Sequence, residues 1–193
     1  MPRKGLTKEA VIDASIQLIQ QQGNGAFSLN ELARVLDIRP ASLYNHIESM
    51  QELTAALGCR IANMIKQAEL EAIAGKKGQD ALFALCDAYR SFARGHIGLY
   101  KVLMGMQKDK SACTPEAFRE MTMPIMQVLS DYDITPHDRM HWQRILRAMM
   151  HGFITHEFAG GFLSFSVDSD ETYRMAVRAM ETGLRAAEEA CRK

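Results

Sequence analysis

The sequence has no excess of either charge. Its 23 basic side chains balance 23 acidic ones over 193 residues, and the first fifty residues contain five of each sign. A strongly basic composition, the usual electrostatic sign of a nucleic-acid-binding protein, is therefore missing. Any role in nucleic-acid binding must depend on where individual groups are placed.

Long hydrophobic runs are missing as well. No apolar run approaches the roughly 20 residues that span a bilayer, and the first ten residues, MPRKGLTKEA, lack the apolar stretch of a signal peptide. We therefore expect a soluble, cytoplasmic protein without a membrane partner. Hydrophobic residues still make up 47% of the chain, which is enough for a sizeable core and argues against disorder.

Residue groups typical of metal sites and enzymes are also absent. The four cysteines are scattered without a CxxC pair, so we expect free thiols. His137 and His141 could share one helix face as metal ligands do, but no carboxylate or thiol joins them at a diagnostic spacing. We find no nucleophile elbow, phosphate loop or dinucleotide fingerprint. The sequence therefore predicts no metal, no cofactor and no enzyme activity.

The pattern that is present is helical throughout. Apolar residues recur every three or four positions, and no alternating pattern is long enough to build a sheet. The fold class is therefore expected to be all-α, with about nine helices. Glycine and proline breaks place them near residues 7–22, 28–36, 40–47, 50–74, 79–95, 97–105, 115–131, 136–160 and 169–191.

Two of the predicted helices are too short to be stable alone. Ser28 and Glu31 have the spacing of a capping box at the start of the first, and Pro40 suits the first turn of the second. Two short helices joined by a tight turn have the proportions of a helix-turn-helix, whose second helix enters the DNA major groove. Helix N-termini could then provide the phosphate contacts that a basic patch usually supplies.

Residues 7–53 resemble the DNA-binding domain of the tetracycline-repressor (TetR) family of transcriptional regulators. The resemblance lies in Ala14 and Leu18, the stop at Gly23, and the segments FSLNELARVLDI and PASLYNHI followed by ESMQEL. The segment RAMMHGFITHEFAGGF, residues 147–162, is similar to the WHG-type ligand domain of one TetR subgroup.

The sequence departs from the family pattern at two places, and 75–135 matches only in helical character. Asp37 replaces a glycine common in the turn, which is tolerable because Asp adopts left-handed conformations more readily than most residues. Met50 stands where the family often has a phosphate-contacting lysine, so that contact is not expected here.

The resemblance implies two domains, a helix-turn-helix DNA-binding domain over 1–49 and a helical ligand-binding and dimerisation domain over 50–193. It also implies a homodimeric repressor that binds a palindromic double-stranded DNA operator. A small effector of unknown identity, expected to be hydrophobic, would release it, with helix 50–74 as the lever between the two parts.

Within the second short helix, Leu43 and Ile47 are spaced to face inward. Ala41, Ser42 and Asn45 would then face base edges, with the remaining polar residues at phosphates. The predicted DNA-binding residues are Arg3, Lys4, Ser28, Leu29, Arg39, Pro40, Ala41, Ser42, Tyr44, Asn45 and His46. Two alternatives stay open: Ser28 could be a plain helix cap, and Arg3 with Lys4 could be a solvated tail instead of an arm over the minor groove.

The middle of the chain is rich in methionine and aromatic residues, which adapt to irregular shapes and would line an effector pocket in a TetR-like protein. The alternative is ordinary core packing, and His151 could equally be a hydrogen-bonded core histidine. The predicted ligand-binding residues are Phe92, Tyr100, Met104, Phe118, Met121, Trp142, Met149, His151 and Phe153.

The last two predicted helices carry apolar and small residues in stripes. Such a stripe forms either the core of the chain or half of an intermolecular bundle, and periodicity does not separate the two. The predicted dimer-interface residues are Gly152, His156, Ala159, Val177, Met180 and Leu184. Other functions considered are a purely structural helical dimer and redox regulation through Cys59, whose only basic neighbour in sequence is Arg60.

Overall fold

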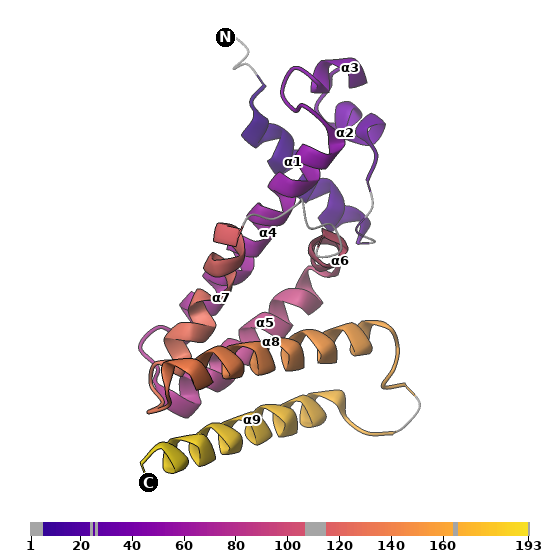
Figure 1. Cartoon of the computed structure of the whole chain (residues 1–193). Coiled ribbons are helices and arrows are strands. Elements are labelled where there is room, and N and C mark those ends of the chain that lie inside the picture. The colour runs from indigo at the N-terminus through magenta and orange to yellow at the C-terminus, as the bar shows by residue number, and fades with distance from the viewer. Residues whose placement is uncertain (1–5, 24, 26, 107–114, 164–165, 193) are drawn as a thin grey trace. The chain divides into compact units, whose positions relative to one another are not determined.

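The structure is a computed structural model that describes residues 6–23, 25, 27–106, 115–163 and 166–192, without the side chains of 106 and 115–119. Over these residues the chain forms nine helices and no strand, so the predicted all-α fold is confirmed (Figure 1). The helices are α1 Lys8–Gln22, α2 Leu29–Val35, α3 Pro40–Leu43, α4 Met50–Ile73, α5 Gly78–Gly95, α6 Ile97–Met106, α7 Pro115–Leu129, α8 Pro136–Phe158 and α9 Ser169–Cys191.

The helices fall into two compact units. Unit 1 combines Met1–Met64 with Ala93–Arg119, and unit 2 combines Ile65–Phe92 with Glu120–Lys193. This division differs from the one expected after residue 49, because α6 packs against α1 and so joins the N-terminal helices. The first part of α4 belongs to unit 1 and its last turns to unit 2. The predicted domain boundary itself stays a prediction.

The contact between α1 and α6 in unit 1 depends on a glycine. A Cβ atom added to Gly98 would lie 2.8 Å from the carbonyl oxygen of Ile19, which is closer than such atoms approach. Beside this contact, Gln20 Nε2 lies 3.1 Å from His96 Nδ1. The absence of a side chain at Gly98 therefore allows the backbones of the two helices to meet.

The starts of α1 and α4 are joined by an ion pair in unit 1. The side chain of Thr7 caps α1 by accepting a 3.2 Å hydrogen bond from the Ala10 amide. Lys8, in the first turn, binds the carboxylate of Glu52 on α4. The backbone amide of Glu52 in turn donates to Ser49 Oγ at 3.1 Å, so the N-terminus of α4 is capped as well.

In unit 2, α8 and α9 run side by side (Figure 1). Their facing residues are buried, with Leu146 and Ile154 on α8 and Tyr173 on α9 fully covered. A Cβ atom added to Gly183 would lie 2.6 Å from the ring of Trp142, so the indole occupies the space above this glycine. None of the described helices of either unit is long and apolar enough to cross a membrane.

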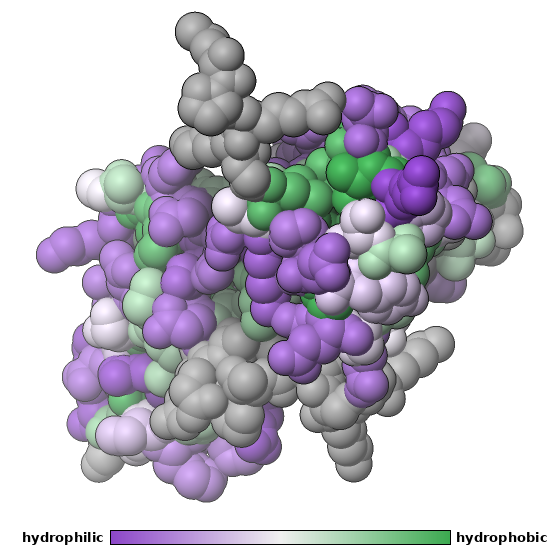
Figure 2. Space-filling view, turned by 90° about the horizontal axis from the view of Figure 1, so that it is seen from above, coloured by the Kyte–Doolittle hydropathy of each residue, from purple (hydrophilic) through white to green (hydrophobic). Residues whose placement is uncertain are grey.

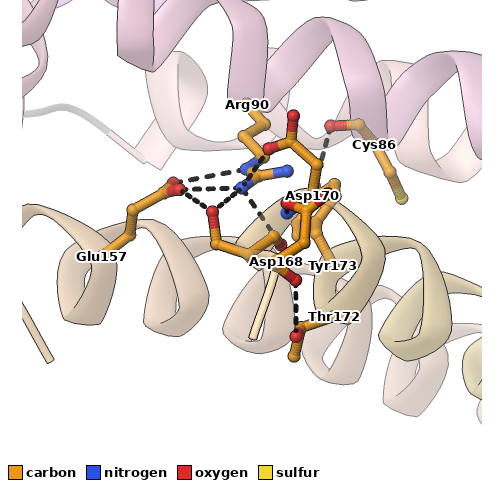
Figure 3. A network of polar contacts seen from close by, with 8 residues as sticks. Cys86, Arg90, Glu157, Asp168, Asp170, Thr172 and Tyr173 are labelled. Atoms are coloured by element: carbon orange, nitrogen blue, oxygen red, sulfur yellow. Dashed lines mark hydrogen bonds and ion pairs between the residues drawn. The ribbon is translucent and has the colours of Figure 1, made fainter. Parts of the chain in front are cut away.

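A buried arginine connects α5 to both helices of this pair (Figure 3). Arg90 is 6% exposed, and its Nη2 atom lies 2.7 Å from Glu157 Oε1 and 3.0 Å from Asp170 Oδ1. Its guanidinium carbon lies 4.5 Å from the ring centroid of Tyr173, whose hydroxyl donates a 2.8 Å hydrogen bond to the backbone oxygen of Cys86. Arg90 therefore fixes the end of α8 and the start of α9 against α5.

Candidate nucleic-acid interface

The first short helix, α2, begins with the expected capping box. The Glu31 amide donates to Ser28 Oγ at 3.2 Å, while the Ser28 amide and hydroxyl donate to Glu31 Oε2 at 2.9 and 2.8 Å. The hydrogen bond from the Ser28 hydroxyl, with that from its amide, lowers the pKa of the Glu31 carboxyl. Both polar groups of Ser28 are thus occupied by the cap.

The turn after α2 contains the left-handed residue that the sequence indicates. Asp37 has a φ of +54°, and the following Ile38 amide donates to the carbonyl oxygen of Ala33 at 3.0 Å. This φ usually selects glycine, and Asp is among the few other residues that adopt it readily. The prediction that Asp37 replaces the turn glycine without loss of the turn is confirmed.

The second short helix, α3, is shorter than predicted. It ends at Leu43 instead of Ile47, because the amides that follow donate to carbonyl oxygens three residues earlier, as in a 3₁₀ turn. The Asn45 amide donates to the Ser42 oxygen at 3.2 Å, and the His46 amide donates to the Leu43 oxygen at 2.8 Å. Leu43 and Ile47 nevertheless face inward as predicted, with exposed fractions of 0% and 2%.

The opposite side of this segment faces solvent. We call it the α3 face, and it consists of the exposed residues Arg39, Pro40, Ala41, Tyr44 and Asn45. Tyr44 is 56% exposed although its neighbour Leu43 is fully buried. In Figure 2, which is seen from above the view of Figure 1, hydrophilic residues surround a group of hydrophobic ones on the visible surface. The predicted contacts Ser42 and His46 are half-buried.

Two basic residues of unit 1 differ in their pairing. Lys8 is bound to Glu52, whose pKa is lowered chiefly by this hydrogen bond. Arg39, by contrast, makes no hydrogen bond or ion pair through its side chain within the described part of the chain. Its guanidinium group is therefore available to an external anion. Of the other predicted contacts, Leu29 is half-buried, and Arg3 and Lys4 lie outside the described residues.

The predicted ligand-binding residues are divided between the two units. Tyr100 and Met104 belong to α6 in unit 1, and the side chain of Phe118 is outside the described part. The remainder belong to unit 2: Phe92, Met121, Trp142, Met149, His151 and Phe153. Trp142 packs over Gly183, and the Phe153 ring lies 5.0 Å from the ring of Tyr173, so contacts within unit 2 account for these two side chains.

The predicted dimer residues lie on two different sides of the α8–α9 pair. Val177 and Leu184 are 1% and 0% exposed and face the core of their own chain, because the stripe that they form packs on α8. For these two residues the intramolecular alternative holds, and Met180 is half-buried. The other three, Gly152, His156 and Ala159, are exposed.

Three charged residues of unit 2 are buried, which was not expected from the sequence. Glu69 is 2% exposed, and Arg90 and Glu188 are 6% exposed each. A single charged residue in an amphipathic helix gives no periodic signal that separates a buried position from the edge of the polar face. The spacing of Glu69 between Ile65 and Ile73, four residues on either side, is the one available indication that it shares their buried face.

Comparison with known proteins identifies both ends of the chain. Residues 11–57 match the family described as bacterial regulatory proteins, tetR family, and residues 82–180 match the tetracyclin repressor-like C-terminal domain. An uncharacterised HTH-type transcriptional regulator of Bacillus subtilis is 29% identical over 153 residues, which cover 79% of each chain. A second such regulator, from Mycobacterium tuberculosis, is 26% identical over 181 residues, 93% of this chain and 82% of the relative.

Solved structures agree on the fold. A protein of unknown function from Rhodococcus sp. RHA1 aligns with a TM-score of 0.78 at 23% identity, covering 94% of this chain and 97% of that one. A TetR variant from Acinetobacter baumannii AYE in complex with minocycline aligns at 0.70 with 16% identity, over 94% and 98%. BioQ with its natural double-stranded DNA operator aligns at 0.67 with 18% identity, over 93% and 98%.

The helix-turn-helix with its exposed α3 face, the helical second unit and the two family matches lead to one assignment. The C-terminal match alone spans about half of the chain. The chain belongs to the tetracycline-repressor (TetR) family of DNA-binding transcriptional regulators.

Proposed function

We propose that the protein is a homodimeric repressor that places α3 of each subunit in the major groove of a palindromic operator. The observation that carries the proposal is the α3 face, where Tyr44 and Asn45 are exposed beside the fully buried Leu43. Asn side chains can bond adenine in two places, and the Ala41 methyl can contact thymine. In a dimer the two half-sites would lie about 34–36 Å apart or at a multiple of that distance.

Phosphate contacts are expected from groups beside the base-reading side chains. Arg39 has no partner for its guanidinium group within the described chain, and the hydroxyl of Tyr44 extends from an exposed position. Arginine binds phosphate with two parallel hydrogen bonds, so a single free arginine can fix register without a broad basic surface. The solved complex of BioQ with its operator supports DNA binding by a protein of this fold.

The exposed faces of α8 and α9 support self-association. Each helix carries a stripe of small or apolar residues, stepping by three or four positions, on the side away from the intramolecular core. The α8 stripe consists of Ile145, Ala148, Gly152, Thr155 and Ala159, and the α9 stripe of Met175, Ala179, Thr182, Ala186 and Ala190. Small residues allow helices of two subunits to pack closely, and a second copy of the chain supplies a matching surface by symmetry.

We assign effector binding to the helical C-terminal part, by analogy with the TetR variant solved with minocycline. A small molecule releases the operator only if it binds the conformer that does not bind DNA more tightly. The route between the sites is α4, since its residues belong to both units.

The mass of the protein–DNA complex tests the proposal. Analytical ultracentrifugation of the full chain with a palindromic site selected from random DNA is expected to show two chains per duplex. A duplex that contains one half-site should bind much more weakly. One chain per full site, or equal binding to both duplexes, would contradict the dimeric operator complex.

A further inference from the structure

In unit 1, the end of α1 meets the start of α6 at glycines (Figure 1). A Cβ atom added to Gly98 on α6 would lie 2.8 Å from the Ile19 carbonyl oxygen and 3.3 Å from the carbonyl carbon of Gly23. A Cβ atom added to Gly25, which follows α1, would lie 3.0 Å from both the Gly98 carbonyl oxygen and Lys101 Cβ. Glycines on both sides of the contact therefore set how closely α1 approaches α6.

The group that faces Gly98 belongs to the last turn of α1. The Ile19 carbonyl oxygen accepts the hydrogen bond that closes this helix, from the Gly23 amide at 3.0 Å. Gly23 has a φ of +67°, which is the left-handed conformation of a helix C-cap. Ile19 itself is fully buried. A methyl group at position 98 would therefore push on a buried, hydrogen-bonded backbone and not on the end of a flexible side chain.

The end of α1 is connected in turn to the helix-turn-helix. Gln22 Nε2 donates a 3.2 Å hydrogen bond to Glu31 Oε1, and the other oxygen of Glu31 accepts from Ser28 in the α2 cap. The helix α1 packs on α2, and α2 packs on α3. Leu32 of α2 and Leu43 of α3 are fully buried in this unit. A shift of α1 against α6 would therefore be passed through packed helices to the α3 face.

We infer that Gly98 is a positioning residue for DNA recognition, which sets the place of the α3 face through its close contact with the end of α1. This inference rests on the proposed reading of the operator by α3, and Gly98 itself does not contact DNA. Hydrogen bonds to base edges weaken steeply with distance and angle, whereas phosphate contacts carry no sequence information. A small displacement of α3 should therefore reduce sequence discrimination more than general affinity for DNA.

Two glycines of α6 provide a matched pair of variants. Gly98→Ala introduces a methyl group at the contact with α1. A Cβ atom added to Gly105, on the same helix, meets nothing within 4 Å in the described part of the chain. Alanine favours a helix more than glycine does at either position, so the two changes differ chiefly in the contact.

Fluorescence anisotropy of the full chain with two labelled duplexes measures discrimination. One duplex is selected from random DNA by the unsubstituted chain, and the other has the same length and a scrambled sequence. Gly98→Ala is expected to lower the ratio of the two affinities about tenfold, as a mismatched base pair does, while binding to the scrambled duplex stays within about twofold. Gly105→Ala should keep the ratio of the unsubstituted chain. Circular dichroism checks that both variants fold.

A smaller change at the same contact decides the question if Gly98→Ala does not fold. Gln20 is exposed, and its Nε2 atom lies 3.1 Å from His96 Nδ1 beside the glycines. Gln20→Ala should lower the affinity ratio in the same direction, by about threefold, because one hydrogen bond between α1 and the start of α6 is lost. Gln17→Ala, at another exposed position of α1, should leave the ratio unchanged.

Two results with Gly98→Ala would overturn the inference. One is an affinity ratio equal to that of Gly105→Ala, and the other is a parallel loss of binding to both duplexes, which indicates a folding defect alone. An unfolded Gly98→Ala together with an unchanged ratio in Gln20→Ala would also overturn it. Absence of any selected sequence for the unsubstituted chain would instead overturn the proposed function, and the inference with it.

Discussion

Tyr44 gives the most direct test of the proposal that the α3 face contacts DNA. Its ring is 56% exposed and makes no large contribution to the core, so its removal should not unfold unit 1. Tyr44→Ala is expected to weaken operator binding about tenfold or more, which corresponds to roughly 1.4 kcal/mol. Fluorescence anisotropy with a labelled operator measures the change.

Two controls separate a DNA contact from a structural effect. Tyr44→Phe keeps the ring and removes the hydroxyl, so it should show most of the loss if the hydroxyl binds phosphate. The sedimentation mass of the free protein should be the same for all three chains. Unchanged operator affinity in Tyr44→Ala would show that Tyr44 does not contact DNA. A change in mass would show that Tyr44 acts on the association of subunits instead.

Glu69 gives the unfolding free energy a specific pH dependence. The folded chain keeps its proton up to a pKa of about 8, while the unfolded chain releases it near 4.5. Between these values the folded state binds more protons, so the unfolding free energy falls as pH rises. Glu69→Gln cannot lose this proton. Its unfolding free energy should therefore rise relative to that of the unsubstituted chain as pH increases from 5 to 8, by up to roughly 4 kcal/mol.

Urea unfolding at several pH values measures this difference. Glu71→Gln is the matched control, since its side chain is exposed on the same helix and should show no such trend. A difference between Glu69→Gln and the unsubstituted chain that is constant from pH 5 to pH 8 would mean that Glu69 is ionised in the folded state.

At the scale of elements, the α8–α9 pair has an inner side that stabilises the subunit and an outer side available to a partner. Gly152 lies on the outer side, and a Cβ atom added there meets nothing within 4 Å. Gly152→Arg is therefore expected to leave the subunit folded, and even to favour the helix, while it separates the dimer. Sedimentation gives the mass, and circular dichroism gives the helix content.

Leu184→Asp tests the inner side of the same pair. Leu184 is fully buried, so a charge there should lower the unfolding free energy of the subunit by several kcal/mol instead of producing a folded monomer. A well-folded Leu184→Asp monomer together with an intact Gly152→Arg dimer would reverse the assignment of the two sides.

Loss of the contacts that Arg90 makes between α5, α8 and α9 should lower the unfolding free energy. Arg90→Met removes the guanidinium group that pairs with the carboxylate of Glu157, whose side chain is only 14% exposed. A loss of about 3–5 kcal/mol in unfolding free energy is expected from breaking a buried pair in this way. Adding Glu157→Gln should restore part of it. Equal stability of Arg90→Met and the unsubstituted chain in urea unfolding would contradict the role given to this link.

The starts of the two short helices could be predicted from local sequence signals. The spacing of Ser28 and Glu31 predicted the cap of α2, and Pro40 predicted the start of α3. The end of α3 was missed because three-residue hydrogen bonds after Leu43 depend on the path of the chain toward α4. The outer stripe of α9 was missed because Val177 and Leu184 give a stronger apolar period than the alanines opposite them.

The interior of unit 2 could not be predicted from local patterns. The partners of Arg90 lie 67 and 80 positions away in the chain, at Glu157 and Asp170, and no sequence spacing connects them. The same holds for Glu69 and Arg147, which come from α4 and α8. The methionine-rich composition suggested a largely hydrophobic effector, whereas the structure also buries the carboxyl group of Glu69 in unit 2.

For the whole molecule, the neutral charge has a consequence for DNA binding. Without a broad basic surface, nonspecific attraction to phosphates should be weak, and affinity should depend on a few placed contacts such as Arg39. The reading of base edges by the α3 face then has to supply most of the discrimination between sequences. In the proposed dimer, two subunits on a palindrome would double these contacts.

Selection of bound sequences from a random duplex DNA pool, with binding of the selected site repeated at two salt concentrations, tests whether the protein is a dimeric repressor that reads DNA through α3. We expect enrichment of a palindrome whose half-sites are separated by about one helical turn or a multiple of it. We also expect an affinity that falls as salt rises. Absence of an enriched sequence for the ligand-free protein, or enrichment of a site without two-fold symmetry, would contradict a dimeric repressor that reads DNA through α3.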